Sequence, residues 1–384
     1  MTRPSEYSAI GDVVKLLADD GFDALGEAIR RIINEAMRLE RQNHLGVGPY
    51  ERSEARRGYA NGYKPKTVQT RVGALDLDVP QVRDSSFYPS SLEKGLRSER
   101  ALKVALAEMY VQGVSTRKVA KITEQLCGFE VTSAQVSRAA KELDEVLEQW
   151  RNRPLGAFPS VFLDARYEKV RHNGSVIDVA VLVAIGVAET GKRQILGTSV
   201  ALSEQEAHWR DFLRSLQERQ LHGVRLFISD AHEGLKAARK AVFPSVPWQR
   251  CQFHLQQNAQ AYVPKKEMRK EVAAAIRNIF NASDEAEAKR QLDLLIKRYE
   301  KSAPRLTEWA EKNIQEGLTI LQFPEEHRRR IRTSNVLERV NKEILRRTRV
   351  ATLFPNEDSC LRLVSAVLME ISEEWETGRT YLTF

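Results

Sequence analysis

The chain has 384 residues, and its 60 Lys and Arg residues against 52 Asp and Glu residues give a formal net charge of +8. This length predicts two or three domains, each large enough for its own hydrophobic core, and excludes a mini-protein. No apolar run approaches the roughly 18 residues of a membrane helix, and the N-terminus lacks the apolar stretch of a signal peptide. Only three cysteines occur, widely spaced, which disfavours a disulfide framework. We therefore expect a cytoplasmic protein with no membrane partner.

The first 95 residues divide into a helical segment and a basic segment. Apolar residues at helical spacing over residues 12–43 predict one amphipathic helix in an N-terminal segment, residues 1–48, that would dimerise or bind DNA. Residues 49–95 mix basic residues with Tyr and Gly and predict a strand pair. Such interleaving suits phosphates and bases, and a solvated hairpin with ordinary surface charge is the alternative. The candidate DNA-binding residues here are Arg56, Arg57, Tyr59, Tyr63, Lys64, Lys66 and Arg71.

Residues 96–150 are predicted to form a helix-turn-helix-like DNA-binding domain. Ser115 or Thr116 would cap one helix, Gly128 would end it, and a second helix would run from Thr132 or Ser133 to about Leu147. In this motif the second helix presents its first side chains to the major groove. The candidate base-contacting residues are Ser133, Gln135 and Arg138. A plain helix pair of an all-α subdomain is the alternative.

Residues 151–256 have the strand and helix order βββαβαβ, which is that of a ribonuclease-H-like domain. In that arrangement the first and fourth strands lie side by side and parallel. Asp164 is predicted to end the first strand and Asp230 the fourth, so two carboxylates would emerge at one sheet edge. The fold class is therefore α/β, with an all-α insertion at 257–325 and preceding, mainly helical DNA-binding domains. The second part of the catalytic core, residues 326–384, would contain a helix bearing Glu338 and a C-terminal helix.

Basic residues are concentrated around Glu338. On a helical wheel one acidic group lies amid a cationic face, which would contact DNA phosphates. Asp164, Asp230 and Glu338 together resemble a DDE triad, which can hold two Mg²⁺ or Mn²⁺ ions for phosphoryl transfer. Each also has a plain alternative, because strand-end Asp residues often cap turns and Glu338 stands at capping-box spacing from Asn335. The candidate DNA-binding residues of this segment are Arg332, Arg339, Lys342, Arg346 and Arg349.

Three further residues are candidates for accessory roles in the active site. Cys251 and His254 have the spacing of half a zinc site, but no second pair lies nearby in the sequence. His254 could orient a carboxylate or a phosphate, whereas the position of Cys251 at a strand end favours a core residue. His232 could lie near a phosphate or cap a helix. Trp309 could pack in the insertion or stack on a displaced base.

Several blocks of the sequence resemble the bacterial Mutator-like DDE transposases. They include GYANGYKPKTVQTRVGALDLDVPQVRD, FLDARY around Asp164, LFISDAHEGL around Asp230, WQRCQFH, and RTSNVLERVNKEILRRTRV around Glu338. The resemblance implies a ribonuclease-H-like catalytic domain with a helical insertion, preceded by domains that bind terminal inverted repeats. It also implies donor-strand nicking, 3′-hydroxyl strand transfer, and action as a homodimer on paired DNA ends. The C-x-x-H block is characteristic of that family, which raises the functional weight of Cys251 and His254.

The leading hypothesis is thus a metal-dependent DNA transposase of an insertion sequence, with two ions per active site. Its partners would be double-stranded DNA of the element ends and of the target, and it would be cytoplasmic and associated with the nucleoid when bound to DNA. A catalytically inactive DNA-binding regulator and a structure-specific nuclease of the same fold are the alternatives. Metal-dependent nicking would exclude the first, and a joining step would exclude the second.

Overall fold

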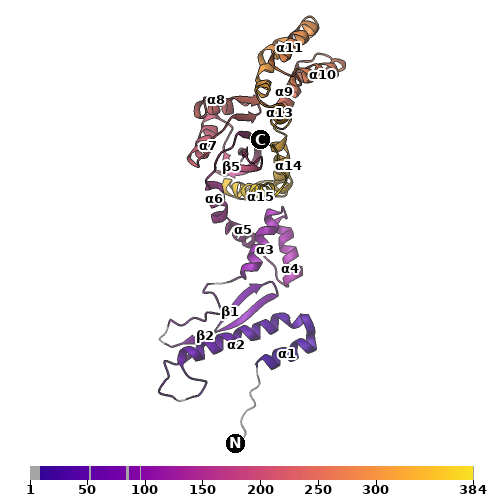
Figure 1. Cartoon of the computed structure of the whole chain (residues 1–384). Coiled ribbons are helices and arrows are strands. Elements are labelled where there is room, and N and C mark those ends of the chain that lie inside the picture. The colour runs from indigo at the N-terminus through magenta and orange to yellow at the C-terminus, as the bar shows by residue number, and fades with distance from the viewer. Residues whose placement is uncertain (1–8, 52, 84–85, 96, 384) are drawn as a thin grey trace. The chain divides into compact units, whose positions relative to one another are not determined.

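The computed structural model describes residues 9–51, 53–83, 86–95 and 97–383. Residues 1–8 of the predicted N-terminal segment therefore lie outside the described residues. The chain forms two compact units, Met1–Tyr110 with Val114–Glu142, and Val111–Gly113 with Leu143–Phe384 (Figure 1). Of the helices in these described ranges, none is both long and apolar enough to cross a bilayer.

The smaller unit begins with two helices where the sequence predicted one. Helix α1 (Ala9–Asp20) and helix α2 (Leu25–Leu45) are separated by the 3₁₀ turn η1 (Gly21–Ala24). The prediction of a single helix was wrong because Gly21 has a φ of 61°, a left-handed conformation that interrupts an α-helix. Met37 of α2 is fully buried, and this face of the helix packs on the strands that follow.

Strands β1 (Ala60–Thr70) and β2 (Gly73–Val82) form the predicted antiparallel hairpin. They are 11 and 10 residues long, longer than the short pair expected. Alternate apolar residues of the hairpin face α2, as a period of two requires. The buried residues of this small core are Met37, Val68, Leu75, Leu77, Val79 and Leu92.

Three helices follow in this part of the chain: α3 (Arg100–Val111), α4 (Thr116–Cys127) and α5 (Ser133–Lys141). The predicted caps are confirmed, because the side chains of Ser115 and Thr132 accept hydrogen bonds at the starts of α4 and α5. The second helix ends at Lys141 and not near Leu147. Its last turn tightens where Glu142 N–H bonds to the Ala139 carbonyl three residues back.

The larger unit contains a five-stranded sheet of order β5-β4-β3-β6-β7. Strands β3, β4 and β5 form the predicted antiparallel meander, and β6 pairs parallel with β3 and with β7. The first and fourth strands of this region therefore lie side by side and parallel, as the strand order predicted. The strands are β3 (Ser160–His172), β4 (Ser175–Val187), β5 (Arg193–Ala201), β6 (Leu226–Ser229) and β7 (Trp248–Arg250).

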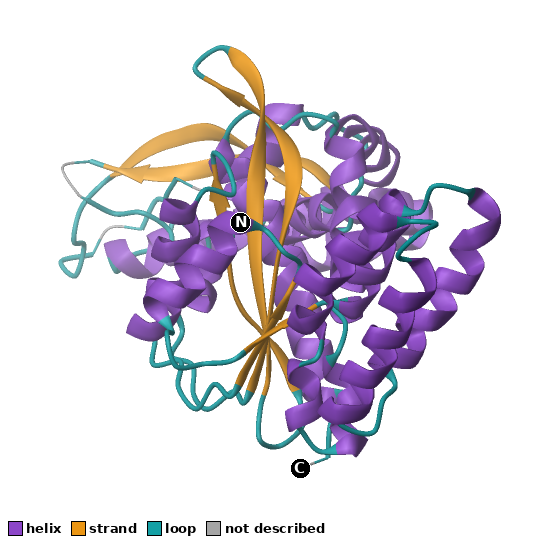
Figure 2. Ribbon diagram, turned by 90° about the horizontal axis from the view of Figure 1, so that it is seen from above, coloured by secondary structure: helices purple, strands orange, loops and turns teal. Residues whose placement is uncertain are grey.

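Helices cover both faces of this sheet (Figure 2). Val161 and Leu163 of β3 join a core with helices α7 (Glu206–Glu218) and α8 (Glu233–Val242). The residues of β3 that alternate with these face helix α14 (Asn335–Thr348). Asp164 accepts a hydrogen bond from Asn341 of this helix, and Glu168 accepts one from Thr348. Helix α15 (Glu357–Thr377) lies against β5 and contacts α14, and helix α6 (Asp144–Asn152) packs on α15.

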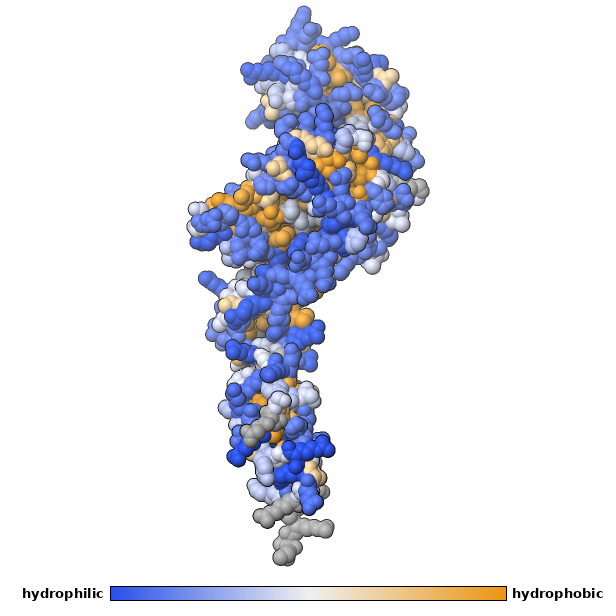
Figure 3. Space-filling model, turned by 90° about the vertical axis from the view of Figure 1, so that its left-hand side faces the viewer, coloured by the Kyte–Doolittle hydropathy of each residue, from blue (hydrophilic) through white to orange (hydrophobic). Residues whose placement is uncertain are grey.

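The insertion between β7 and α14 is helical throughout, as predicted, and lies at the top of Figure 1. Hydrophilic side chains dominate the face of the molecule in Figure 3, with smaller apolar patches between them. The helices of this region are α9 (Gln252–Ala259), α10 (Arg269–Phe280), α11 (Glu285–Tyr299), α12 (Pro304–Asn313) and α13 (Glu325–Ile331). The 3₁₀ turns are η2 (Gln260–Tyr262), η3 (Lys266–Met268), η4 (Ile314–Gly317) and η5 (Thr319–Gln322), with η6 (Arg349–Ala351) after α14.

Candidate active site

Two carboxylates follow the parallel pairing of β3 and β6. The last pair in register is Leu163 with Ser229, so Asp164 and Asp230 are the next residues along the two strands. Asp230 follows the end of β6, as predicted. Asp164 does not end its strand, because β3 continues to His172 in an antiparallel ribbon with β4. The parallel ladder nevertheless stops at Leu163, so Asp164 lies where this edge of the sheet opens.

Asp164 is held by the helix that bears the predicted glutamate. Asn341 Nδ2 donates a hydrogen bond of 2.8 Å to Asp164 Oδ2. Burial raises the pKa of Asp164 to about 6, although the hydrogen bonds from Ala165 and Asn341 lower it. The ionised carboxylate is thus short of compensating positive charge. Sequence analysis missed Asn341, although its position three residues after Glu338 places both on one side of a helix.

His254 lies between the other two predicted carboxylates. Its Nδ1 is 3.8 Å from Asp230 Oδ2, and its Nε2 is 3.9 Å from Glu338 Oε1. Both distances exceed a hydrogen bond, and the buried Nδ1 has no well-formed hydrogen bond to a described residue. Interaction with the Cys251 sulfur, and then the charges of Asp230 and Glu338, raise the pKa of His254 to about 9 against the opposing effect of burial. The imidazole therefore lies between two carboxylates whose charges favour its protonated form.

Glu338 lies in the first turn of α14 with its side chain 31% exposed. The capping-box alternative is wrong, because Asn335 is already helical and the N-cap residue is Ser334, whose side chain makes no capping hydrogen bond. The backbone N–H of Glu338 donates to the Ser334 carbonyl at 3.1 Å as part of the helix. The carboxylate is therefore not used to cap α14 and faces His254.

Cys251 connects the helix of His254 to the helix of Glu338. It is fully buried just before α9, and its Sγ accepts a hydrogen bond of 3.3 Å from the Ser334 N–H. Burial alone would raise the pKa of the Cys251 thiol, but its interactions with His254 and Ser334 lower it. The two members of the C-x-x-H block thus have different places. Cys251 supports the start of α14, and His254 contacts the carboxylates.

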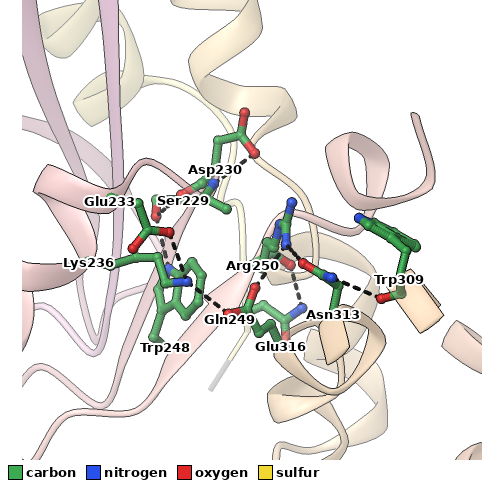
Figure 4. A network of polar contacts seen from close by, with 11 residues as sticks. Ser229, Asp230, Glu233, Lys236, Trp248, Gln249, Arg250, Trp309, Asn313 and Glu316 are labelled. Atoms are coloured by element: carbon green, nitrogen blue, oxygen red, sulfur yellow. Dashed lines mark hydrogen bonds and ion pairs between the residues drawn. The ribbon is translucent and has the colours of Figure 1, made fainter. Parts of the chain in front are cut away.

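A network of polar contacts holds the backbone of Asp230 at the end of β6 (Figure 4). Trp248 Nε1 donates to Ser229 Oγ at 2.9 Å, and Ser229 Oγ donates to the Asp230 carbonyl at 2.8 Å. The Asp230 carboxylate accepts a 2.8 Å hydrogen bond from the Ala231 N–H. These contacts fix the backbone at the end of β6 and leave the second carboxylate oxygen of Asp230 toward His254.

Arg250 joins this sheet edge to the helical insertion. Its side chain is 7% exposed, and its Nη1 donates to Asn313 Oδ1 and Glu316 Oε2, each at 2.9 Å (Figure 4). Lys236 of α8 donates to the other oxygen of Glu316, also at 2.9 Å. Glu316 of the insertion thus pairs with Arg250 of β7 and Lys236 of α8. The insertion is thereby anchored to the strand beside β6 and to the helix that follows Asp230.

The three carboxylates do not form one tight cluster. Within the described ranges, no group of three or more His, Cys, Asp or Glu side chains is arranged to enclose a metal ion as it stands. The carboxylates of Asp230 and Glu338 lie on either side of His254. Asp164 lies on β3, the strand that pairs with β6 before Asp230.

Comparison with known proteins decides the family. Residues 5–378 match the sequence model of the family described as "Transposase, Mutator family". The chain belongs to the Mutator family of transposases. This transposase is 59% identical over 370 residues to the transposase for insertion sequence element IS406 of Burkholderia multivorans, covering 96% of this chain and 95% of that one.

Two further relatives cover nearly the whole transposase. The transposase for insertion sequence element ISRM5 of Rhizobium meliloti is 42% identical over 100% of this chain and 96% of its own. The transposase for insertion sequence element IS256 in transposon Tn4001 of Staphylococcus aureus is 36% identical over 99% of this chain and 95% of its own. The resemblance stated from the sequence is confirmed, and the protein is of the insertion-sequence type.

His232 and Trp309 lie outside the group around His254. His232 occupies the N-cap position of α8, but its ring makes no capping hydrogen bond and lies 3.7 Å from Glu204. Its role near a phosphate stays a prediction. Trp309 is 8% exposed and stacks on Tyr262 with ring centroids 5.5 Å apart, which favours the packing interpretation.

The predicted phosphate contacts of α13 and α14 differ in their surroundings. Arg346 is paired with Glu343 at 2.6 Å, and Arg332, which follows α13, donates to Asn281 at 2.7 Å. The other three form no ion pair or side-chain hydrogen bond with a described residue and are exposed: Arg339, Lys342 and Arg349.

The predicted DNA contacts of the smaller unit are also partly engaged. Gln135 completes the capping box with Thr132 and donates to Gln69, whereas Ser133 and Arg138 are exposed. In the hairpin segment, Arg57 and Lys64 have no side-chain partner among the described residues. The engaged members are Arg56 over the Tyr59 ring, Tyr63 with Arg41, Lys66 with Tyr88, and Arg71 with Glu99.

Proposed function

We propose that this transposase is a DDE enzyme that binds the terminal inverted repeats of its element and catalyses metal-dependent strand cleavage and 3′-hydroxyl strand transfer. The observation that carries the proposal is the approach of Asp230 and Glu338 to the two nitrogens of His254, at 3.8 and 3.9 Å. Asp164 completes the set from the neighbouring strand. Asp164 and Asp230, 66 residues apart in sequence, follow adjacent parallel strands, and Glu338, 108 residues further on, approaches Asp230 from α14 through His254.

We assign a ribonuclease-H-like fold to the larger unit. The antiparallel β5-β4-β3 meander, the parallel β3 and β6 pair, and the helices on both faces support this assignment. The division into a first core part at 151–256, a helical insertion at 257–325 and a second core part at 326–384 follows from it. The segments 1–48, 49–95 and 96–150 would bind the DNA ends.

The donor chemistry of the site fits divalent cations. Asp164, Asp230 and Glu338 would hold two Mg²⁺ or Mn²⁺ ions, because hard cations prefer carboxylate oxygens. Burial leaves the Asp164 carboxylate under-compensated, which is the condition that a cation relieves. When bound, such ions activate the attacking water or 3′-hydroxyl and stabilise the leaving oxygen. Asn341 would keep Asp164 oriented, and His254, which lies between Asp230 and Glu338, would help to position those two carboxylates.

The family resemblance supplies the expected partners of the enzyme. It would act on double-stranded DNA, at the element ends and at the target, as a homodimer on paired ends. It would work in the bacterial cytoplasm, at the nucleoid when bound to DNA.

The test compares wild type with Glu338→Gln on a duplex that ends in the candidate inverted repeat, in Mg²⁺ and in Ca²⁺. We expect nicking at the repeat boundary and joining to a target only with Mg²⁺ and an intact Glu338. The variant should bind the duplex nearly as well as wild type, because the Glu338 carboxylate that it lacks does not contact a DNA phosphate. The matched control is Glu343→Gln on the same helix, whose carboxylate pairs with arginines and not with the site.

The outcomes separate the candidate functions. Repeat-specific binding by wild type without any cut in Mg²⁺ would support a regulator and overturn the proposal. Cutting of branched DNA without joining would support a nuclease. Equal loss of binding and cutting in Glu338→Gln would overturn the role given to Glu338.

A further inference from the structure

A pocket of about 320 Å³ beside the start of α14 has four arginines among its eight lining residues. They come from three elements that are distant in sequence: a strand of the sheet, the last helix of the insertion, and α14 itself. Arg339 directly follows Glu338, so the pocket and the candidate active site share the first turns of one helix. The cationic and aromatic lining residues are Arg193, Arg329, Arg330, Arg339 and Tyr381.

The four guanidinium groups lack acidic partners. None of them forms an ion pair or a side-chain hydrogen bond with a residue in the described ranges. Arg346 and Arg347 on the same helix, by contrast, both pair with Glu343. Four like charges around one pocket repel each other, and an anion in the pocket would remove that repulsion.

The pocket is also pre-organised. The Arg193 guanidinium lies 4.2 Å from the Trp375 ring centroid and 4.7 Å from that of Tyr381, and Arg330 lies 5.5 Å from the Tyr381 ring. The Tyr381 hydroxyl donates to the Arg330 carbonyl at 2.8 Å. Arg193 Nε is buried without a hydrogen-bond partner among the described residues. The aromatic rings hold the cations in place and leave their N–H groups unused.

We propose that this pocket binds a phosphodiester group of the DNA strand that passes the candidate active site. Planar guanidinium groups donate pairs of hydrogen bonds to phosphate oxygens, and the N-terminus of the 14-residue α14 adds partial positive charge. Because Arg339 and Glu338 both lie in the first turns of α14, we expect one strand to reach both the pocket and the candidate active site. The identity of this strand rests on the proposed function, whereas the phosphate site itself does not.

The first test uses inorganic phosphate as the probe on the full chain. We expect 50 mM phosphate to raise the melting temperature of wild type by about 2–4 °C over chloride at equal ionic strength. The double variant Arg330→Gln with Arg339→Gln should lose this rise, and Arg339→Gln alone should reduce it. The control is Arg290→Gln with Arg346→Gln, which removes two charges whose guanidinium groups already pair with glutamates.

The second test locates the phosphate on DNA. Single phosphates of the strand to be cut are replaced by neutral methylphosphonates, and duplex binding is measured without Mg²⁺. Wild type should lose affinity roughly tenfold at one position near the repeat boundary, and the double variant should be insensitive there. For the double variant, the slope of log Kobs against log salt should also be shallower by about 0.9, which is the contribution of one phosphate.

The results distinguish this proposal from the proposed function. Two results would overturn the pocket assignment even if the enzyme cuts DNA. One is a double variant whose melting temperature still rises with phosphate. The other is an equal loss of affinity by wild type and the double variant at every methylphosphonate position. A wild type that never cuts but shows the phosphate effect and its loss would overturn the proposed function and keep the pocket.

Discussion

Asn341 is the one described side chain that donates a hydrogen bond to the carboxylate of Asp164, at 2.8 Å. Groups that orient metal ligands commonly change metal affinity or activity by about 10- to 100-fold when removed. Asn341→Ala should therefore need a higher Mg²⁺ concentration for half-maximal nicking, by roughly tenfold. Titrating nicking with Mg²⁺ measures this. An unchanged Mg²⁺ requirement with a lower maximal rate would instead mean a general structural role.

Glu343 links acidity to stability on α14. Its hydrogen bonds with Arg346, and then with Arg347, lower its pKa to about 2 from the usual 4.5. A carboxylate with a depressed pKa stabilises the folded state above its unfolded pKa, and this contribution is lost as the pH falls from about 4.5 toward 2. With solvent screening of a side chain 29% exposed, we expect about 1 kcal/mol.

The measurement is the melting temperature of wild type and Glu343→Gln at pH 7 and pH 3. The variant should melt about 2–4 °C lower at pH 7, and the difference should shrink at pH 3. The control is Glu311→Gln, whose exposed carboxylate forms no ion pair with a described residue. A difference that is constant with pH would contradict the assignment.

The helix α14 couples the candidate site to the rest of the larger unit. Near the start of the helix, Glu338 faces His254 and Asn341 bonds to Asp164 of the sheet, and near its end the Arg347 side chain is 5% exposed. Arg347 pairs with Glu370 of α15 at 2.6 Å and with Glu343 at 2.9 Å. These contacts tie the C-terminal part of α14 to α15.

Arg347→Met should therefore destabilise the larger unit by about 2 kcal/mol, because Glu370 loses its arginine partner and Glu343 keeps only Arg346. The loss should appear as a lower midpoint of urea unfolding. Arg346→Met on the neighbouring, 60% exposed position should change the free energy of unfolding by less than about 0.5 kcal/mol. Equal effects of the two substitutions would show that the pairing of the buried Arg347 with Glu370 is unimportant.

At the level of elements, local signals in the sequence predicted much of the fold. Turn residues and alternation predicted the hairpin and the meander, and capping residues predicted the starts of α4 and α5. The break at Gly21 was missed because a single left-handed glycine does not disturb the apolar period around it. The continuation of β3 past Asp164 was missed because it depends on pairing with β4, which is a long-range property.

Over the whole molecule, the order of strands was enough to predict that Asp164 and Asp230 share an edge. The sequence could not predict that His254 lies between Asp230 and Glu338, or that Arg193 joins Arg330 and Arg339. Those contacts depend on how α9, α13 and α14 pack on the sheet, and no local pattern encodes them. Side-chain pairing was equally hidden, and it decides which predicted cations are available to DNA.

The salt dependence of DNA binding tests this last point for the complete chain. Each phosphate neutralised by a cation contributes a slope of about −0.9 to log Kobs against log salt. Six of the predicted cations have no side-chain partner among the described residues, so a slope of about −5 or steeper is expected between 50 and 200 mM salt. They are Arg57, Lys64, Arg138, Arg339, Lys342 and Arg349.

Fluorescence anisotropy of a labelled duplex measures this slope at several salt concentrations. Lys342→Gln should make it shallower by about 0.9, because an exposed, unpaired cation gives up one phosphate contact. Arg71→Gln, at an arginine that pairs with Glu99 at 3.2 Å, should change it less. A flat response of wild type would mean that these cations face solvent in the complex, and a larger effect of Arg71 than of Lys342 would mean that ion pairs such as Arg71 with Glu99 open when DNA binds.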